Sequence, residues 1–220
     1  MKTIQPNHLL KITLLVLCGS AVFVASSSWA TLVTWDLNPT NANASLGASS
    51  QTFTVGGFPI TAYGFDLSGS TPHTLYYKDA NGDHGLGLVG TPHNEIQTTN
   101  FIQFDFTSIL SQGFINGQMK FSSVDQGESF NLYGSNTVGT LGVLLTGSPF
   151  GDSTNNTFIN IPNFGTYKFV SVIANVADIL PWAFQADFTP IPEAGTLIPV
   201  ILLAAAAMAF EARRRRHATA

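Results

Sequence analysis

Hydrophobic and polar residues alternate over short stretches through most of the chain. From Ile102 to Phe106 every second residue is hydrophobic, and Gln103 and Asp105 occupy the positions between them. Because side chains alternate between the two faces of a strand, this period of two predicts a half-buried β-strand. Residues 167–174 are hydrophobic on both faces, which predicts a central strand. Comparable patterns predict further strands at 51–55, 60–67, 74–78, 114–124, 129–133, 141–146 and 182–188.

Turn-forming residues separate these strands, and no segment between residues 31 and 189 shows a sustained helical period. The turn signals are Gly56-Gly57, Asn81-Gly82, Asn116-Gly117 and Gly147-Ser148-Pro149. Short strands at this spacing predict an all-β fold, with residues 31–189 forming a single jelly-roll-like β-sandwich domain. A β-solenoid is the alternative architecture, but the chain has no fixed repeat period to support it.

The charge balance excludes some partners. Only 10% of the 220 residues are charged and 45% are hydrophobic, which argues against a disordered chain. Between residues 31 and 189 there are three lysines, nine aspartates and two glutamates, a formal charge of −8. An acidic segment without arginine argues against nucleic acid and anionic lipid as partners. The chain has one cysteine, Cys18, so no disulfide within the chain is expected. Cys18 lies within residues 1–30.

Residues 1–30 have the three parts of a secretory signal peptide. Lys2 and Lys11 supply positive charge, residues 12–25 are mainly hydrophobic, and Ser28 and Ala30 place small residues before Thr31. A short membrane anchor is the alternative, but the hydrophobic stretch is shorter than the ~20 residues that span a bilayer. We therefore expect signal peptidase to cut before Thr31 and the protein to be exported.

The other end of the chain combines a linker, a hydrophobic segment and a cationic cluster. Residues 190–195 are rich in proline, residues 194–210 are almost wholly hydrophobic, and the cluster Arg213, Arg214, Arg215 and Arg216 follows. The segment is at the lower length limit for a transmembrane helix. Arginines next to such a helix stay in the cytoplasm, so the ectodomain is expected outside. A buried C-terminal core helix is the alternative, but the segment lacks a polar face.

This tripartite end, carried by Pro192-Glu193-Ala194, resembles the PEP-CTERM sorting signal of Gram-negative bacteria, also catalogued as an ice-binding-protein C-terminal domain. The resemblance covers residues 191–217, within a predicted sorting region of 190–217, and Ala194 stands where the family has a second proline. It implies an exosortase, a membrane-embedded transpeptidase-like protease. This enzyme would recognise Pro192-Glu193, cut nearby, and release or transfer the protein to the cell surface, often beside exopolysaccharide.

Residues 60–188 are also similar to a recurring ectodomain of PEP-CTERM proteins. The similarity is carried by residues 81–88, 93–96, 101–105 and 128–142. It implies a fold and an extracellular location, and it implies no particular chemistry.

One acidic loop is a candidate calcium site. Asp79, Asn81 and Asp83 place oxygen side chains at every second position, and Glu95 is a candidate fourth ligand. Calcium prefers six to eight oxygen ligands, and such a loop can place several around one point. The ion would be structural, and no other cofactor is expected. The alternative is a plain Asn-Gly hairpin turn with solvated acids.

Other catalytic and metal motifs are weak. The spacing of His73, His84 and His93 matches no zinc motif, and the chain has no Gly-x-Ser-x-Gly segment. A glycosidase pair drawn from Glu95, Glu128 and the aspartates stays open, because such carboxylates are distant in sequence. We expect no enzyme, with a polysaccharide hydrolase as an alternative.

Aromatic residues raise carbohydrate binding as a further alternative, because sugars stack on exposed rings. The candidate rings are Trp35, Tyr63, Tyr76, Tyr77, Tyr133 and Trp182. Aromatic residues also fill β-sandwich cores, and Trp182 falls on the hydrophobic face of its predicted strand with Phe184. The sequence favours an exported, non-enzymatic surface or matrix protein, associated with the membrane only transiently and with extracellular polysaccharide afterwards.

Overall fold

The computed structural model describes residues 30–145, 149–189, 203–209 and 214. Over these residues the chain is all-β, as predicted, and its named strands pair in antiparallel fashion. The strands are β1 (Thr31–Asp36), β2 (Ala44–Ser45), β3 (Ser50–Val55), β4 (Phe58–Asp66), β5 (Leu75–Ala80), β6 (Asp83–Leu88), β7 (Asn100–Asp105), β8 (Phe114–Ser122), β9 (Ser129–Ser135), β10 (Val143–Leu144), β11 (Phe150–Gly151), β12 (Phe158–Asn160), β13 (Phe169–Val176) and β14 (Leu180–Phe188). The helical turns are η1 (Pro92–Asn94), α2 (Thr107–Leu110) and η2 (Asp152–Thr154).

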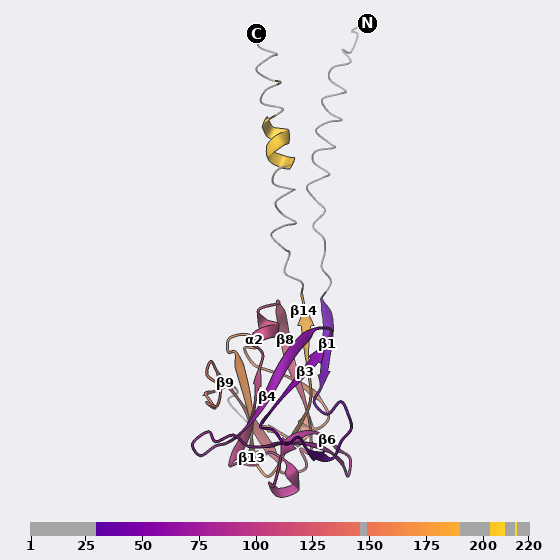
Figure 1. Cartoon of the computed structure of the whole chain (residues 1–220), viewed down its shortest axis with the longest axis vertical. Coiled ribbons are helices and arrows are strands. Elements are labelled where there is room, and N and C mark those ends of the chain that lie inside the picture. Colours follow the sequence, from indigo (N-terminus) through magenta and orange to yellow (C-terminus); the bar gives the residue numbers. More distant parts are fainter. Residues whose placement is uncertain (1–29, 146–148, 190–202, 210–213, 215–220) are drawn as a thin grey trace. The chain divides into compact units, whose positions relative to one another are not determined.

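Two sheets pack against each other and share the main hydrophobic core (Figure 1). Their strand orders are β1-β14-β8-β12 and β10-β9-β13-β7-β4-β3, with β11 also paired to β9. Between them, the rings of Phe121 in β8 and Phe130 in β9 lie 4.0 Å apart. Phe106, which follows β7, stacks on Phe184 of β14 at 4.4 Å. A third sheet, β2-β5-β6, contacts β14 through β6.

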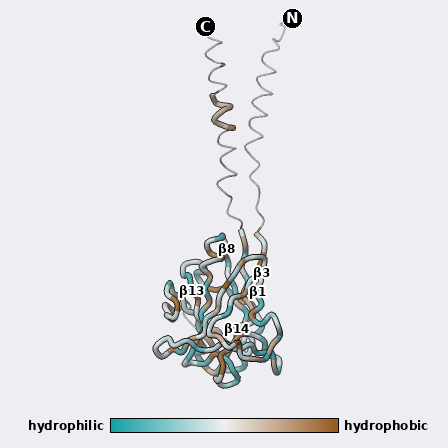
Figure 2. Tube along the Cα trace, in the orientation of Figure 1, coloured by the Kyte–Doolittle hydropathy of each residue, from teal (hydrophilic) through white to brown (hydrophobic). Residues whose placement is uncertain are grey.

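Hydrophobic and hydrophilic residues follow one another closely along the strands (Figure 2). This alternation does not reveal α2, because a single helical turn is too short to show a period of 3.6 residues. The expectation that residues 31–189 contain no helix is therefore wrong at this turn. Helix α2 begins beside Asp105, whose Oδ1 accepts a hydrogen bond from the Thr107 N–H at 2.8 Å.

Strand β7 is buried on both faces at Gln103, although its alternating pattern predicts that the face carrying Gln103 is exposed. Gln103 is fully buried. Its Nε2 donates to the Thr140 carbonyl at 2.9 Å and to Ser171 Oγ at 3.1 Å, and its Oε1 accepts from the Gly139 N–H at 2.7 Å. This polar position is therefore a hydrogen-bonded buried amide, which satisfies the rule that buried polar groups need partners.

Strand β14 departs from regular alternation at Trp182. Its pairing with β8 shifts between Pro181 and Ala183, so Trp182 is the extra residue of a β-bulge. The prediction that Trp182 shares the hydrophobic face of Phe184 is therefore wrong. The ring lies instead against Lys120, whose Nζ is 3.4 Å from the ring centroid.

The first and last strands of the β unit are neighbours. Thr31 of β1 pairs with Phe188 of β14, so residues 30 and 189 lie at the same end (Figure 1). Asp178 precedes the start of β14, and the nine residues of this strand span about 30 Å. Asp178 and its surroundings therefore lie at the opposite end of the β unit, which consists of residues 30–190.

The predicted signal peptide and sorting signal lie almost wholly outside the described residues. This applies to residues 1–29 and to the motif Pro192, Glu193 and Ala194. Within the predicted sorting signal, the structure describes residues 203–209, which are helical, and Arg214. Among the described residues no helix is long and apolar enough to span a bilayer.

The shared aromatic core makes a direct stability prediction. Phe184 is fully buried between the two sheets and contacts Trp35, Phe106 and Phe164. Phe184→Ala should lower the free energy of unfolding by about 4 kcal/mol, because it removes apolar contacts and leaves a cavity. Leu32→Ala, at an exposed position, should change it by less than about 0.5 kcal/mol. Chemical denaturation measures both, and equal losses would contradict the shared core.

Candidate functional site

The predicted calcium loop is a tight hairpin turn. Asn81 and Gly82 have φ angles of 59° and 91°, both in the left-handed region that a type I′ turn requires. The register pairs Asp79 with His84 and Ala80 with Asp83. Because facing residues share one side of a hairpin and successive residues alternate, Asp79 and Asp83 point to opposite sides. The structure does not gather the four predicted ligands around one point, and calcium at this loop stays a prediction.

On one side of the hairpin, Asp83 and Glu95 meet at Lys78. Lys78 Nζ donates a hydrogen bond to Glu95 Oε1 and lies 3.1 Å from Asp83 Oδ2. Lys78 is 7% exposed and Glu95 is 1% exposed, so this is a buried ion pair. Burial opposes the charge of Lys78, but the hydrogen bonds and negative charges of Glu95 and Asp83 outweigh it and raise its pKa.

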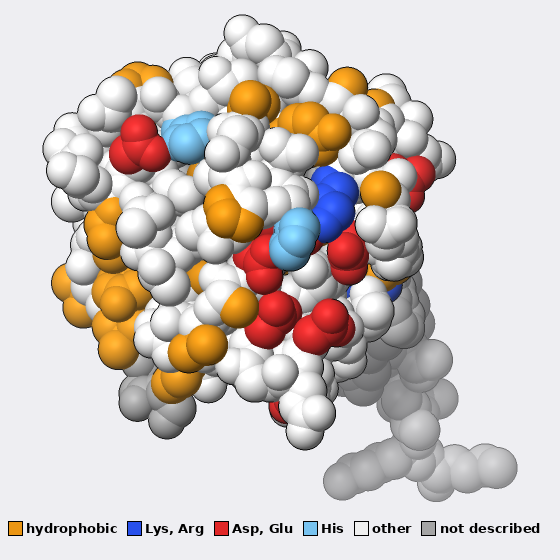
Figure 3. Space-filling model, turned by 90° about the horizontal axis from the view of Figure 1, so that it is seen from below, with side chains coloured by type: hydrophobic (Ala, Val, Ile, Leu, Met, Phe, Trp, Pro, Cys, Tyr) orange, Lys and Arg blue, Asp and Glu red, His pale blue; other side chains and the backbone are white. Residues whose placement is uncertain are grey.

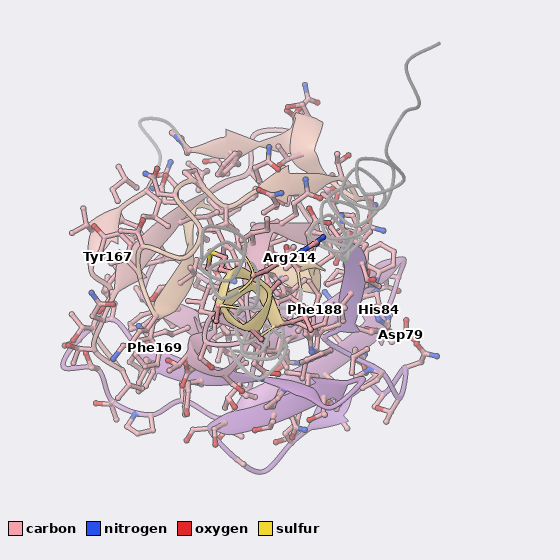
Figure 4. The ribbon with its side chains drawn as sticks, turned by 90° about the horizontal axis from the view of Figure 1, so that it is seen from above. Asp79, His84, Tyr167, Phe169, Phe188 and Arg214 are labelled. Carbon is pink, nitrogen blue, oxygen red and sulfur yellow. The ribbon has the colours of Figure 1, made fainter. Side chains whose placement is uncertain are left out.

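On the other side of the hairpin, His84 lies between two aspartates. Its Nε2 is 3.1 Å from Asp36 Oδ1, and its Nδ1 is 3.5 Å from Asp79 Oδ1. Figure 4 shows Asp79 and His84 next to each other at the edge of the β unit. The His84 ring is also 5.3 Å from the ring of Trp182.

The three histidines named in the sequence occupy separate places. His73 uses both ring nitrogens, at 2.7 Å from Asp66 Oδ1 and 2.8 Å from the Val89 carbonyl. His84 lies on the outer side of the hairpin, and His93 lies beside Asp178. The structure therefore does not bring the three histidines together as one ligand set.

A different cluster forms at the end of the β unit away from Thr31 and Phe188. His93 Nδ1 is 2.6 Å from Asp178 Oδ2. One potential ligand atom from each of His93, Glu95 and Asp178 lies within 4.8 Å of the others. Figure 3 shows acidic side chains gathered around a histidine and a lysine on this face. Glu95 Oε2 is buried and has no hydrogen-bond partner among the described residues.

The backbone holds this cluster in place. His93 and Asn94 have φ angles of 54° and 56°, a left-handed conformation that is uncommon for residues other than glycine. A Cβ on Gly87 would overlap the Asn94 carbonyl oxygen, so only glycine permits this loop to lie so close to β6. Ile96 and Ile179 exchange backbone hydrogen bonds at 3.0 and 3.2 Å, which fixes the two segments that carry Glu95 and Asp178.

Further carboxylates surround the cluster. Burial raises the pKa of Glu95, and the charge of Asp178 acts in the same direction, against the opposing effects of Lys78 and Ser123. Burial also raises the pKa of Glu128, and nearby Asp178 adds to this effect. The Glu128 Oε2 accepts a hydrogen bond from the Asp125 N–H at 2.7 Å. The local charge is therefore strongly negative, because acids outnumber the one lysine in contact with them.

A second feature is a polar pocket of about 540 Å³ beside β8 and β12. Its lining consists of Asn116, Gly117, Gln118, Asn160, Ile161, Asn163, Phe164 and Asp187. The Asn116 Nδ2 donates to Asp187 Oδ2 at 2.9 Å, and the Gln118 Nε2 donates to Asn160 Oδ1 at 2.7 Å. Four amides and a carboxylate around one pocket can donate and accept several hydrogen bonds, as a hydroxyl-rich ligand requires.

The candidate aromatic rings differ in their availability. Trp35 is fully buried, so it cannot stack on a sugar. Trp182 is half-buried, and both Lys120 and His84 contact its ring. The four tyrosines are also half-buried: Tyr63, Tyr76, Tyr77 and Tyr133. None of these rings lines the polar pocket, whose aromatic residue is Phe164.

The residues of the sorting prediction add nothing to either feature. Pro192, Glu193 and Ala194, with Arg213, Arg215 and Arg216, lie outside the described residues. Arg214 is helical and partly exposed.

Comparison with protein-family models, with curated proteins and with solved structures found no match for the chain. The resemblance to PEP-CTERM proteins therefore stays a prediction.

The buried ion pair predicts an asymmetric response to substitution. Lys78→Met should lower the free energy of unfolding by about 3 kcal/mol, because it leaves the buried Glu95 carboxylate without its partner. Lys78→Met combined with Glu95→Leu should recover most of that loss. Lys168→Met, at an exposed lysine, is the matched control and should change stability by less than about 0.5 kcal/mol. Chemical denaturation of the variants would contradict this account if the double variant were no more stable than Lys78→Met.

Proposed function

We propose that the chain is an exported, non-enzymatic surface or extracellular-matrix protein, sorted by an exosortase-type system and associated with extracellular polysaccharide. Residues 31–189 are its jelly-roll-like β-sandwich ectodomain. Signal peptidase removes residues 1–30, and the hydrophobic segment 194–210 holds the protein in the membrane until the exosortase acts at Pro192-Glu193-Ala194. The arginines at 213–216 keep the tail in the cytoplasm.

The observation that carries this proposal is the pairing of Thr31 with Phe188. It places both ends of the β unit at one edge, so the chain enters and leaves the ectodomain at the same end. Two membrane-directed segments attached there can serve one membrane without passing around the β unit. The opposite end, which carries Glu95 and Asp178, is then available to partners outside the cell.

The sorting proposal predicts the ends of the mature protein. Protein recovered from the cell surface should begin at Thr31 and end near Pro192 to Ala194. Glu193→Ala should leave a full-length, membrane-bound form, because it removes the acidic residue of the recognition motif. Glu211→Ala makes the same change beyond the hydrophobic segment and should be processed normally. Intact-mass measurement gives the termini, and a released protein that retains residues 213–216 would contradict the proposal.

The polar pocket favours a carbohydrate-binding module as a second candidate. Its volume lies within the ~300–1,000 Å³ common for small-ligand pockets. Its amides lie on the outer side of the β1-β14-β8-β12 sheet, where the Gln185 Nε2 donates to Gln118 Oε1 at 2.5 Å. This site would contact the polysaccharide along a face of the ectodomain, while the amides replace hydrogen bonds that its hydroxyl groups make with water.

This second candidate predicts a loss of binding on removal of two amides. Gln118→Ala with Asn160→Ala should weaken binding to exopolysaccharide from the producing cells at least about tenfold, because buried sugar hydroxyls would lose their partners. Gln51→Ala, on strand β3 of the other sheet, is the matched control and should bind normally. Affinity electrophoresis measures binding, and equal retardation of all variants would contradict a role for the pocket. Depolymerisation of the same material would favour the hydrolase alternative.

A further inference from the structure

We propose that His93, Glu95 and Asp178 form a binding site for a divalent transition-metal ion such as zinc. The site lies where η1 meets the segment before β14, at the end of the β unit opposite to Thr31 and Phe188. It differs from the predicted calcium loop, because Asp79 and Asn81 do not belong to it.

The three side chains are arranged nearly as ligands around one bound ion would be. Their potential ligand atoms lie within 4.8 Å of one another. Two nitrogen or oxygen ligands at about 2.1 Å from one zinc ion can be at most about 4.2 Å apart. Small side-chain adjustments therefore suffice to bring all three atoms to one ion. His93 and Asp178 already approach to 2.6 Å, and the ion would lie where they now share a hydrogen.

Glu95 supplies a second and independent reason to expect a ligand. The residue is 1% exposed, and Lys78 binds only one of its carboxylate oxygens. The other, Oε2, is buried, and no group among the described residues donates a hydrogen bond of normal geometry to it, although the Ser123 side chain lies near enough to the carboxylate to oppose the rise of its pKa. An unsatisfied buried carboxylate oxygen costs free energy, and a metal ion would satisfy it.

The surrounding charge also favours a cation. Four carboxylates gather here. Asp83 and Glu95 both contact Lys78, and Asp178 lies near Glu95 and Glu128. The single positive charge of Lys78 leaves an excess of negative charge that a divalent ion would reduce. Because Lys78 binds Glu95 Oε1, it holds the carboxylate in place while Oε2 stays free.

The donor set distinguishes between classes of ion. Calcium takes oxygen ligands almost exclusively and needs six or more of them. One imidazole with two carboxylates suits zinc and its neighbours in the transition series. The His93 side chain is 74% exposed, so solvent can reach the site and water can complete the coordination.

The test is calorimetric titration of the full chain, kept in mild detergent, with Zn²⁺ and separately with Ca²⁺. Zinc should bind with one high-affinity site per chain, and calcium should bind at least about tenfold more weakly. His93→Gln and Asp178→Asn should each weaken zinc binding at least about tenfold. His93 is exposed, so its variant should fold normally even if changes at the buried Glu95 do not.

Asp79→Asn is the matched control for Asp178→Asn. It removes the same charge from an aspartate that is also beside a histidine, His84, but on the side of the β5-β6 hairpin away from Glu95. It should leave zinc binding unchanged. Zinc affinity that is insensitive to His93→Gln would overturn the proposal, as would tighter binding of calcium than of zinc. Loss of affinity in Asp79→Asn with none in Asp178→Asn would move the site to the predicted loop and overturn it as well.

Discussion

The acidic end of the β unit depends on the ion pairs of the buried Lys78 ammonium group. This group projects from β5 into a space that Asp83 of β6 and Glu95 share. Removing either charge from such a pair is costly, because the remaining charge has lost its water without gaining a partner. The pair therefore ties the β5-β6 hairpin to the loop that carries Glu95. It also satisfies one oxygen of Glu95 and leaves the other free, which gives this end its capacity to bind a cation.

The rest of the fold gives the β unit two unlike ends. The core aromatics join the two larger sheets, and the pairing of β1 with β14 brings both termini of the unit to one edge. The same strand β14 begins next to Asp178 at the far end. One long strand thus connects the edge where the chain enters and leaves with the end where the carboxylates gather. This separation suits the proposed export, in which the protein is held temporarily by its termini.

Sequence patterns predict the strands well where a strand has one buried face and one exposed face. They also predict the Asn81-Gly82 turn, because the required positive φ angles restrict which residues occur there. They fail at Gln103, where a second layer of residues covers the outer side of β7, and at Trp182, where a bulge reverses the expected side. Both failures arise from contacts between segments that are distant in the chain.

The candidate metal site was beyond prediction for the same reason. Glu95 was named from the sequence, but as a partner of Asp79, Asn81 and Asp83. Asp178 lies far along the chain, and the bridge between Ile96 and Ile179 brings it near. Local spacing contains no information on that bridge. The left-handed conformation of His93 and the close approach of its loop to Gly87 are likewise tertiary features.

The central claim is that the Lys78–Glu95 pair leaves a carboxylate oxygen of Glu95 free to bind an ion together with His93 and Asp178. X-ray absorption at the zinc edge of the zinc-loaded chain tests it most directly. The account predicts a shell of nitrogen and oxygen ligands at about 2.0–2.1 Å that includes a single imidazole, and the imidazole signal should disappear in His93→Gln. A shell with several imidazoles, or one that His93→Gln leaves unchanged, would contradict it.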